Sequence, residues 1–204
     1  MKRFYLQTVR VTFAAILLSF PLAFVLPVEI SFENAVLENI QVIVLIATTI
    51  LNLLLCGKGM ERDVKFFHVS IAGIALLLVM RELSWGRVFF PEGIEESGPV
   101  FVDMSDYPFK IPVFIFVTLY VIALATLIFK HFPLKKLLRS ELPIAGLIIL
   151  TLTGILQYTA EHKPGILRMN RLEGQIFEEF NELFFYSTLP GICIYLNKSL
   201  KRKT

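Results

Sequence analysis

The sequence predicts an all-α integral membrane protein, a bundle of six transmembrane helices. Hydrophobic residues make up 55% of the chain and charged residues 18%, with a mean hydropathy of +0.68. Soluble domains are usually less apolar and more charged. The apolar residues gather in blocks long enough to cross a bilayer core of about 30 Å. We therefore expect residues 1–204 to form a single transmembrane helical domain.

The connections between the apolar blocks alternate in charge. The predicted spans are 11–28, 36–56, 66–86, 111–129, 142–160 and 175–196. Basic residues gather before the first span, in the second and fourth connections and after the last span: Lys2, Arg3, Arg10, Lys58, Arg62, Lys65, Lys130, Lys135, Lys136, Arg139, Lys198, Lys201, Arg202 and Lys203. Because positive loops stay in the cytoplasm, both termini are predicted to be cytoplasmic in a bacterial-type inner (plasma) membrane.

The last predicted span carries acidic residues in its first half, and we expect the other spans to be arranged around it. Gln175, Glu178 and Glu182 fall on one stripe of a helix at about 100° per residue. Glu179 lies beside that stripe. A carboxylate at the centre of a membrane helix costs about 3 kcal/mol. These side chains are therefore expected to face protein, water or a metal.

Three further spans are predicted to bring polar residues to the same depth. Arg81 and Glu82 precede Trp85 by about one turn, and tryptophan is enriched at the membrane interface. A guanidinium can bridge two carboxylates, so Arg81 is predicted to pair with Glu82, Glu178 or Glu182. The residues expected at this outer level are Glu38, Gln41, Arg81, Glu82, Tyr158, Glu161, His162, Glu178, Glu179 and Glu182.

These residues predict an outer-leaflet site that acts on a lipid or another amphiphilic small molecule. The chemistry would be acid–base or metal-assisted, since crowded carboxylates favour a protonated acid beside an ionised base. The candidate catalytic residues are Glu178, Glu182, Glu82 and His162. The candidate substrate-binding residues are Arg81, expected to orient an anionic head group, with Glu38, Gln41, Tyr158 and Glu161.

The need for a cofactor is left open. Carboxylates with one imidazole suit a divalent metal, and the candidate ligands are Glu178, Glu182 and His162. The Glu-x-x-His unit of di-iron bundles is absent from the sequence. A purely structural polar network is a further alternative. No nucleophile elbow, Walker loop, zincin motif or dinucleotide-binding glycine pattern occurs.

Two other function classes fit the sequence. A small transporter or channel needs polar residues that continue to the cytoplasmic side, and the stripe of Gln41, Thr49 and Asn52 on the second span offers them. A non-catalytic accessory subunit needs a free apolar face, which span 111–129 can supply. The expected partners are membrane lipids and a membrane-protein partner or a second copy of the chain. Nucleic acid is not an expected partner.

Glycine and proline residues predict features of the connections and of helix packing. The connection 87–110 is the longest outside the spans and contains several of both, so its regular structure is expected to be short. Gly86, just before this connection, is expected to allow a sharp turn or a close helix contact. Gly146 and Gly154 are expected to let neighbouring helices approach the fifth span closely.

Two short stretches carry a resemblance. Arg81-Glu82-Leu83-Ser84-Trp85-Gly86, followed later by Glu178-Glu179-x-x-Glu182, resembles a pattern of uncharacterised bacterial multi-pass inner-membrane proteins. This resemblance implies a helical inner-membrane protein and brings no established activity. The membrane hydrolases related to alkaline ceramidases also combine acidic and histidine groups in a helical bundle. The chain lacks their His-x-x-x-His pair and seventh span, so their zinc chemistry is not carried over.

Overall fold

The computed structural model describes residues 2–57, 61–95, 98–139 and 141–201. The fold is all-α, with about 80% of the residues in helices. The long helices are α1 (Lys2–Ala23), α2 (Val36–Leu55), α3 (Arg62–Glu82), α4 (Lys110–His131), α6 (Ile144–His162) and α7 (Arg171–Lys201). The shorter elements are helix α5 (Leu134–Arg139), the 3-10 turns η1 (Val28–Ser31), η2 (Ser84–Phe89) and η3 (Pro164–Leu167), and strands β1 (Pro91–Glu95) and β2 (Gly98–Phe101).

Five helical segments of the described chain are long and apolar enough to cross a membrane. They are Tyr5–Ala23, Val28–Leu55, Arg62–Glu82, Lys110–His131 and Ile144–His162. Each overlaps one of the first five predicted spans. Helix α7 is longer but is not one of these five segments. Length and composition together suggest a membrane protein.

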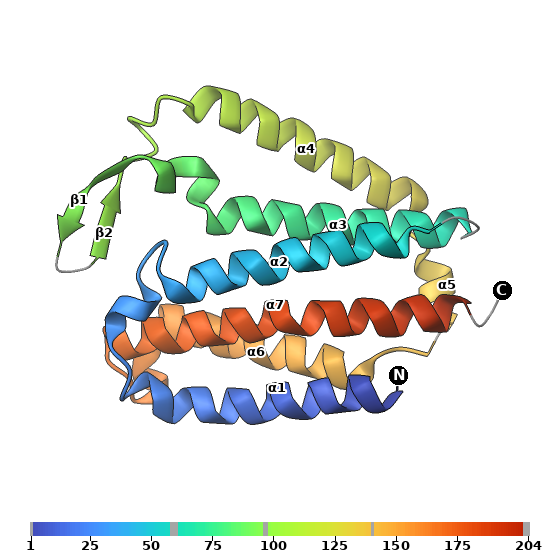
Figure 1. Ribbon diagram of the computed structural model, residues 1–204, viewed down its shortest axis with the longest axis horizontal. Helices are drawn as coiled ribbons and strands as arrows, with labels where there is room; N and C mark the ends of the chain where they lie inside the picture. Colours follow the sequence, from blue (N-terminus) through green and yellow to red (C-terminus); the bar gives the residue numbers. More distant parts are fainter. Residues whose placement is uncertain (1, 58–60, 96–97, 140, 202–204) are drawn as a thin grey trace.

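Successive long helices run in opposite directions, so α1 begins and α7 ends at the same end of the bundle (Figure 1). The strands β1 and β2 lie at the opposite end, which is called the hairpin end below. Helix α7 packs against α6, α1 and α2, and α2 packs against α3. The last helix therefore occupies the middle of the bundle.

The buried apolar core has three clusters, and α7 contributes to each of them. Phe177 belongs to the cluster nearest the hairpin end, with Ala23 of α1 and Ala160 of α6. Tyr186 packs in the middle cluster with α2 and α3. Leu196 lies in the cluster nearest the termini. Helices α1, α2, α3 and α6 therefore pack against α7, as expected, whereas α4 packs on α3 instead.

Helix α4 lies at the edge of the bundle, and none of its residues is buried. It packs on α3, where Gly73 leaves room for its side chains. The Tyr120 hydroxyl donates a hydrogen bond to the Gly73 carbonyl at 2.9 Å. A Cβ on Gly73 would lie 2.8 Å from Leu124 Cδ1. Toward the hairpin end, α4 diverges from α3 (Figure 1).

The regular structure in the connection between α3 and α4 is short, as predicted, with strands of five and four residues. Strands β1 and β2 form an antiparallel hairpin in which Pro91 lies opposite Phe101. Before the hairpin, Ser84, Trp85 and Gly86 have φ angles of 44°, 57° and 93°. The predicted sharp turn at Gly86 is confirmed, because this left-handed region suits glycine best. The hairpin is a finding beyond the prediction of short regular structure.

Gly146 is a point of close contact between helices. A Cβ at this position would lie 2.9 Å from both Ile192 Cγ1 and the Tyr5 hydroxyl. The Gly146 N–H also donates a hydrogen bond to that hydroxyl at 2.6 Å. We expect Gly146→Leu to lower the melting temperature of the purified protein by about 5 °C, because overpacking costs about 1–3 kcal/mol.

Gly154 provides the matched control in the same helix. A Cβ there would meet no atom within 4 Å, so the prediction that Gly154 allows close helix approach is wrong. We expect Gly154→Leu to leave the melting temperature unchanged. Equal losses from the two substitutions would show that the packing at Gly146 does not determine stability.

Candidate functional site

An acidic pocket with a volume of about 280 Å³ lies at the hairpin end of the bundle. It is formed by the start of α2, the end of α3, the first half of α7 and the turns η1 and η2. Its lining residues are Ser31, Glu33, Glu38, Arg81, Glu82, Ser84, Gln175, Glu178, Glu179 and Glu182. Six of these ten side chains are glutamates and one is an arginine. Helical periodicity places three of the glutamates, since 178, 179 and 182 share one side of α7.

Arg81 is held by two carboxylates at the floor of the acidic pocket. Its Nη2 lies 2.6 Å from Glu182 Oε1, and its Nε lies 3.6 Å from Glu82 Oε1. Both glutamate side chains are 4% exposed, whereas that of Arg81 is 48% exposed. The predicted pairing of Arg81 with Glu82 and Glu182 is confirmed. Two buried carboxylates therefore share one half-exposed cation.

The hydroxyl of Tyr186 joins the same two carboxylates. It lies 2.9 Å from Glu82 Oε1 and 2.8 Å from Glu182 Oε1, and it accepts a hydrogen bond from Arg81 Nη1 at 3.3 Å. A phenol has one proton to donate. It can therefore make a full hydrogen bond to only one carboxylate, and a proton on the other carboxyl group would satisfy the second contact.

The α2 side of the acidic pocket is fixed by hydrogen bonds from amides. Glu38 accepts a hydrogen bond at 2.6 Å from the N–H of Asn34, so its carboxylate also joins the first turn of α2 to the loop before it. Gln41 lies beneath the pocket and is fully buried. Its Nε2 donates to Glu179 Oε2 at 2.8 Å and to the Glu179 carbonyl at 3.1 Å. These contacts join α2 to α7.

The turns η1 and η2 supply the remaining wall. The Ser84 hydroxyl donates a hydrogen bond to Glu33 Oε1 at 2.5 Å, which connects the end of α3 to the loop before α2. Gln175 Nε2 donates to the Ser31 carbonyl at 2.9 Å. Four loop and helix-end residues thus hold the rim of the acidic pocket in place.

The structure brings together part of the predicted set. Of the predicted site residues, Glu38, Arg81, Glu82, Glu178 and Glu182 line the acidic pocket. Gln41 contacts it from below through Glu179. The expected convergence in depth is therefore accompanied, for α2, α3 and α7, by convergence in one cavity.

The prediction that Glu161 and His162 line the same pocket is wrong. Both are exposed, at 53% and 48%, and His162 Nδ1 lies 3.3 Å from Glu161 Oε2. The His162 ring stacks on Tyr158, which is also exposed and lies outside the pocket. These residues end α6, which packs on α7 and α1, whereas the acidic pocket faces α2 and α3. Equal depth in the bundle did not mean a shared face.

The candidate metal ligands are separated by the same geometry. Glu178 and Glu182 line the acidic pocket, but His162 does not. Among the residues that the structure describes, no three histidine, cysteine, aspartate or glutamate side chains are grouped so that they could hold a metal ion. The acidic pocket is therefore lined by carboxylates without an imidazole.

The predicted site set missed several residues. Tyr186 follows Glu182 by four positions, so helical periodicity places it on the same stripe, one turn deeper. Ser84 adjoins Trp85 in the segment 81–86, which also contains the predicted residues Arg81 and Glu82. Glu33 lies in a short loop, and no sequence signal connects it with Ser84. Glu179 was expected at the right depth but was not assigned a role.

A second group of buried polar residues lies nearer the termini. His68 is fully buried on α3. Its Nδ1 lies 2.9 Å from Asn52 Oδ1 of α2, and its Nε2 lies 3.2 Å from Asn197 Oδ1 of α7. Asn52 Nδ2 donates to the Thr48 carbonyl at 2.8 Å. Polar side chains between α2, α3 and α7 therefore continue beyond the acidic pocket.

The fold and the acidic pocket define a helical chain with five segments able to cross a membrane and a carboxylate-rich cavity at one end. No family model matches the chain, and no characterised protein or solved structure matches it significantly.

Proposed function

We propose that the chain is a six-span inner-membrane protein whose acidic pocket binds the cationic group of a small or amphiphilic molecule at the outer membrane face. The observation that carries this proposal is the lining of one cavity by six glutamates and one arginine. A cleft lined by one sign of charge concentrates ligands of the opposite sign. An ammonium group has three donors for these carboxylates.

The position of Arg81 favours a cationic ligand over an anionic one. Its guanidinium already contacts Glu82 and Glu182, so its charge is balanced within the protein. The pocket has four further glutamates that do not contact Arg81 and can bind a cation: Glu33, Glu38, Glu178 and Glu179. This proposal replaces the expectation that Arg81 orients an anionic head group.

Acid–base chemistry in this proposal belongs to Glu82, Tyr186 and Glu182. Glu182 makes the shorter contact with Arg81 and is assigned the ionised state. Glu82 then carries the proton that satisfies the second contact of the Tyr186 hydroxyl. Such a pair has one group able to donate a proton and one able to accept it. A bound amine could exchange a proton with this pair.

The proposed topology uses α7 as the sixth span and places both termini in the cytoplasm. The alternating helix directions and the basic connections at the end opposite the hairpin support it. We expect a phosphatase reporter fused after Asp103, in the connection that follows the hairpin, to be active because it is exported. Reporters fused after Lys65 and Lys136 should be inactive. An active reporter after Lys65 or Lys136, together with an inactive one after Asp103, would show that the orientation is the opposite of the proposed one.

Ligand-dependent stabilisation tests the proposed function. A ligand that binds only the folded protein stabilises it by about 2.7 kcal/mol at 100 times its dissociation constant. We expect saturating ethanolamine to raise the melting temperature of the detergent-purified protein by about 5 °C. Inorganic phosphate at the same ionic strength should give no rise. Stabilisation by phosphate alone would refute a cation site.

Carboxylate variants inside and outside the acidic pocket test whether ethanolamine binds in the pocket. Glu38→Gln and Glu178→Gln remove charge from the acidic pocket and are expected to weaken ethanolamine binding by about tenfold each, since a hydrogen bond to a charged group contributes about 1.5–3 kcal/mol. Glu92→Gln removes an exposed carboxylate of β1, at the same end of the bundle but outside the pocket. It should bind ethanolamine as the unmodified protein does. Equal weakening by all three would indicate surface charge rather than a site.

A second candidate function is transport of the bound cation or of a proton. The network of Asn52, His68 and Asn197 favours it, because buried polar groups continue from the acidic pocket toward the termini. Gln41 Oε1 and Asn181 Oδ1 are buried polar atoms without a hydrogen-bond partner among the described residues. Buried water commonly satisfies such atoms. Uptake of ethanolamine by proteoliposomes separates transport from binding alone.

A further inference from the structure

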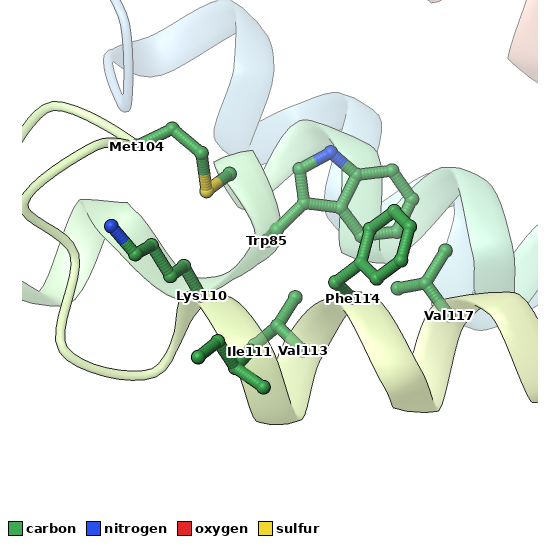
Figure 2. A pocket seen from close by; sticks show the side chains of 7 residues that line it. All are labelled: Trp85, Met104, Lys110, Ile111, Val113, Phe114 and Val117. Atoms are coloured by element: carbon green, nitrogen blue, oxygen red, sulfur yellow. The ribbon is translucent and has the colours of Figure 1, made fainter.

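A second cavity, with a volume of about 400 Å³, lies between α4 and the turn η2. We call it the Trp85 cavity. Its lining residues are Trp85, Met104, Lys110, Ile111, Val113, Phe114 and Val117. Lys110 is the only charged residue of this lining. Figure 2 shows Lys110 and Met104 at one end of the cavity, Val117 at the other, and the Trp85 indole beside Phe114 between them.

The Trp85 cavity results from the way in which α4 packs. Tyr120 and Leu124 bring the second half of α4 against α3 at Gly73. The first half diverges toward the hairpin end (Figure 1). The left-handed backbone of Ser84 and Trp85 turns the chain away from the axis of α3. The space between the two elements is left without a protein side chain to fill it.

We propose that the Trp85 cavity binds one acyl chain of an anionic phospholipid, with the phosphate at Lys110 and the chain extending along Trp85 toward Val117. The charge distribution supports this occupant, because the cavity has one cation at its mouth and apolar side chains beyond it. A lysine near a membrane surface attracts anionic lipid. This site is separate from the acidic pocket and does not depend on the function proposed for it.

The contacts of Lys110 agree with a head group at the mouth. Its ammonium donates a hydrogen bond to the Ser105 carbonyl, and Figure 2 shows it pointing away from Val117. An ammonium has three donors, so two remain for phosphate oxygens. The nearby acids Asp103 and Asp106 belong to the preceding turn and do not line the cavity.

The length of the Trp85 cavity suits a chain that enters one leaflet. From Lys110 to Val117 the helix rises about 10 Å at 1.5 Å per residue. One leaflet of a bilayer core is about 15 Å thick. A chain whose head group lies at Lys110 therefore passes through most of the leaflet beside the Trp85 cavity. Acyl carbons would contact Trp85 directly.

Trp85 is the only tryptophan of the chain and reports on its own cavity. The experiment titrates detergent-purified protein with phosphatidylglycerol brominated on its acyl chains and records tryptophan fluorescence. We expect saturable quenching at about one lipid per protein. Brominated phosphatidylcholine should need about fivefold more lipid for half-quenching, because it carries no net charge to complement one lysine. Added inorganic phosphate should compete weakly or not at all, since it has no chain.

Two substitutions on α4 test the two ends of the Trp85 cavity. Lys110→Gln should remove the preference for phosphatidylglycerol, and Lys130→Gln at the other end of the same helix should keep it. Val117→Phe fills the apolar end and should abolish saturable quenching. Val121→Phe, on an exposed position one turn further along, should leave it intact. All four changes lie on a helix without buried residues, so folding should be preserved.

Three results would overturn the proposal. One is equal quenching by both lipids with no effect of Val117→Phe, which would mean unspecific contact with bulk lipid. Another is competition by inorganic phosphate that is as strong as competition by unbrominated phosphatidylglycerol. That result would mean that the site binds phosphate without an acyl chain. The third combines two observations. The unmodified protein shows no saturable quenching, and light scattering shows that it is a dimer which Val117→Phe converts to a monomer. That result would assign the surface to a second copy of the chain.

Discussion

Replacing Arg81 with methionine is expected to lower the stability of the purified protein by about 2 kcal/mol, or its melting temperature by about 5 °C. Methionine keeps the apolar stem and removes only the guanidinium, which contacts the buried carboxylates of Glu82 and Glu182. Loss of one partner from a fully buried pair costs about 3–5 kcal/mol. The expected loss is smaller because Arg81 is half-exposed and solvent screens its charge.

Arg10→Met is the matched control, since Arg10 is exposed on α1 away from the acidic pocket. It should leave the melting temperature unchanged. In a Glu182→Gln background, Arg81→Met should cost less than it does alone, because one of the carboxylates has then already been neutralised. Additive losses in that double variant would show that Arg81 and Glu182 do not interact.

Replacing Tyr186 with phenylalanine is expected to lower stability by about 2 kcal/mol, because it removes a buried hydrogen bond to a carboxylate, and a hydrogen bond to a charged group contributes about 1.5–3 kcal/mol. Tyr186 is 1% exposed, and phenylalanine keeps the packing of its ring. The change therefore removes only the hydroxyl between Glu82 and Glu182. Thermal unfolding in detergent measures the loss.

Tyr158→Phe removes a hydroxyl from an exposed tyrosine at the same end of the bundle and should have no effect. If Tyr186→Phe is as stable as the unmodified protein, the hydroxyl does not join the two carboxylates. The proposed proton exchange would then lose its structural basis, whereas the cation site formed by the other glutamates would remain to be judged by binding.

The parts of the fold and of the acidic pocket that follow from periodicity were predictable. Apolar blocks placed five helices at the right positions, and the spacing of Glu178 and Glu182 put them on one face of the last helix. The depth of Arg81, read from its distance to Trp85, matched the depth of these acids. The pairing of Arg81 with these acids was predicted from the need to neutralise buried charge.

The parts that depend on the arrangement of helices in the plane were not predictable. Glu161 and His162 reach the right depth, but their helix α6 packs on α7 and α1, and both side chains are exposed outside the acidic pocket. Sequence spacing gives position along a helix and around it, not which helix is its neighbour. The bond between Ser84 and Glu33 joins two loops that are far apart in the chain, so it required the folded structure.

The central claim is that the acidic pocket binds cations rather than anions. Calorimetric titration of the purified protein tests this claim most directly. Putrescine, a diammonium compound, should bind at one site per chain, and a Glu38→Gln/Glu178→Gln double variant should bind it about 100-fold more weakly. Glycerol phosphate, an anion of similar size, should give no binding heat. Binding of glycerol phosphate in a manner that depends on Arg81, with no binding of putrescine, would contradict the account.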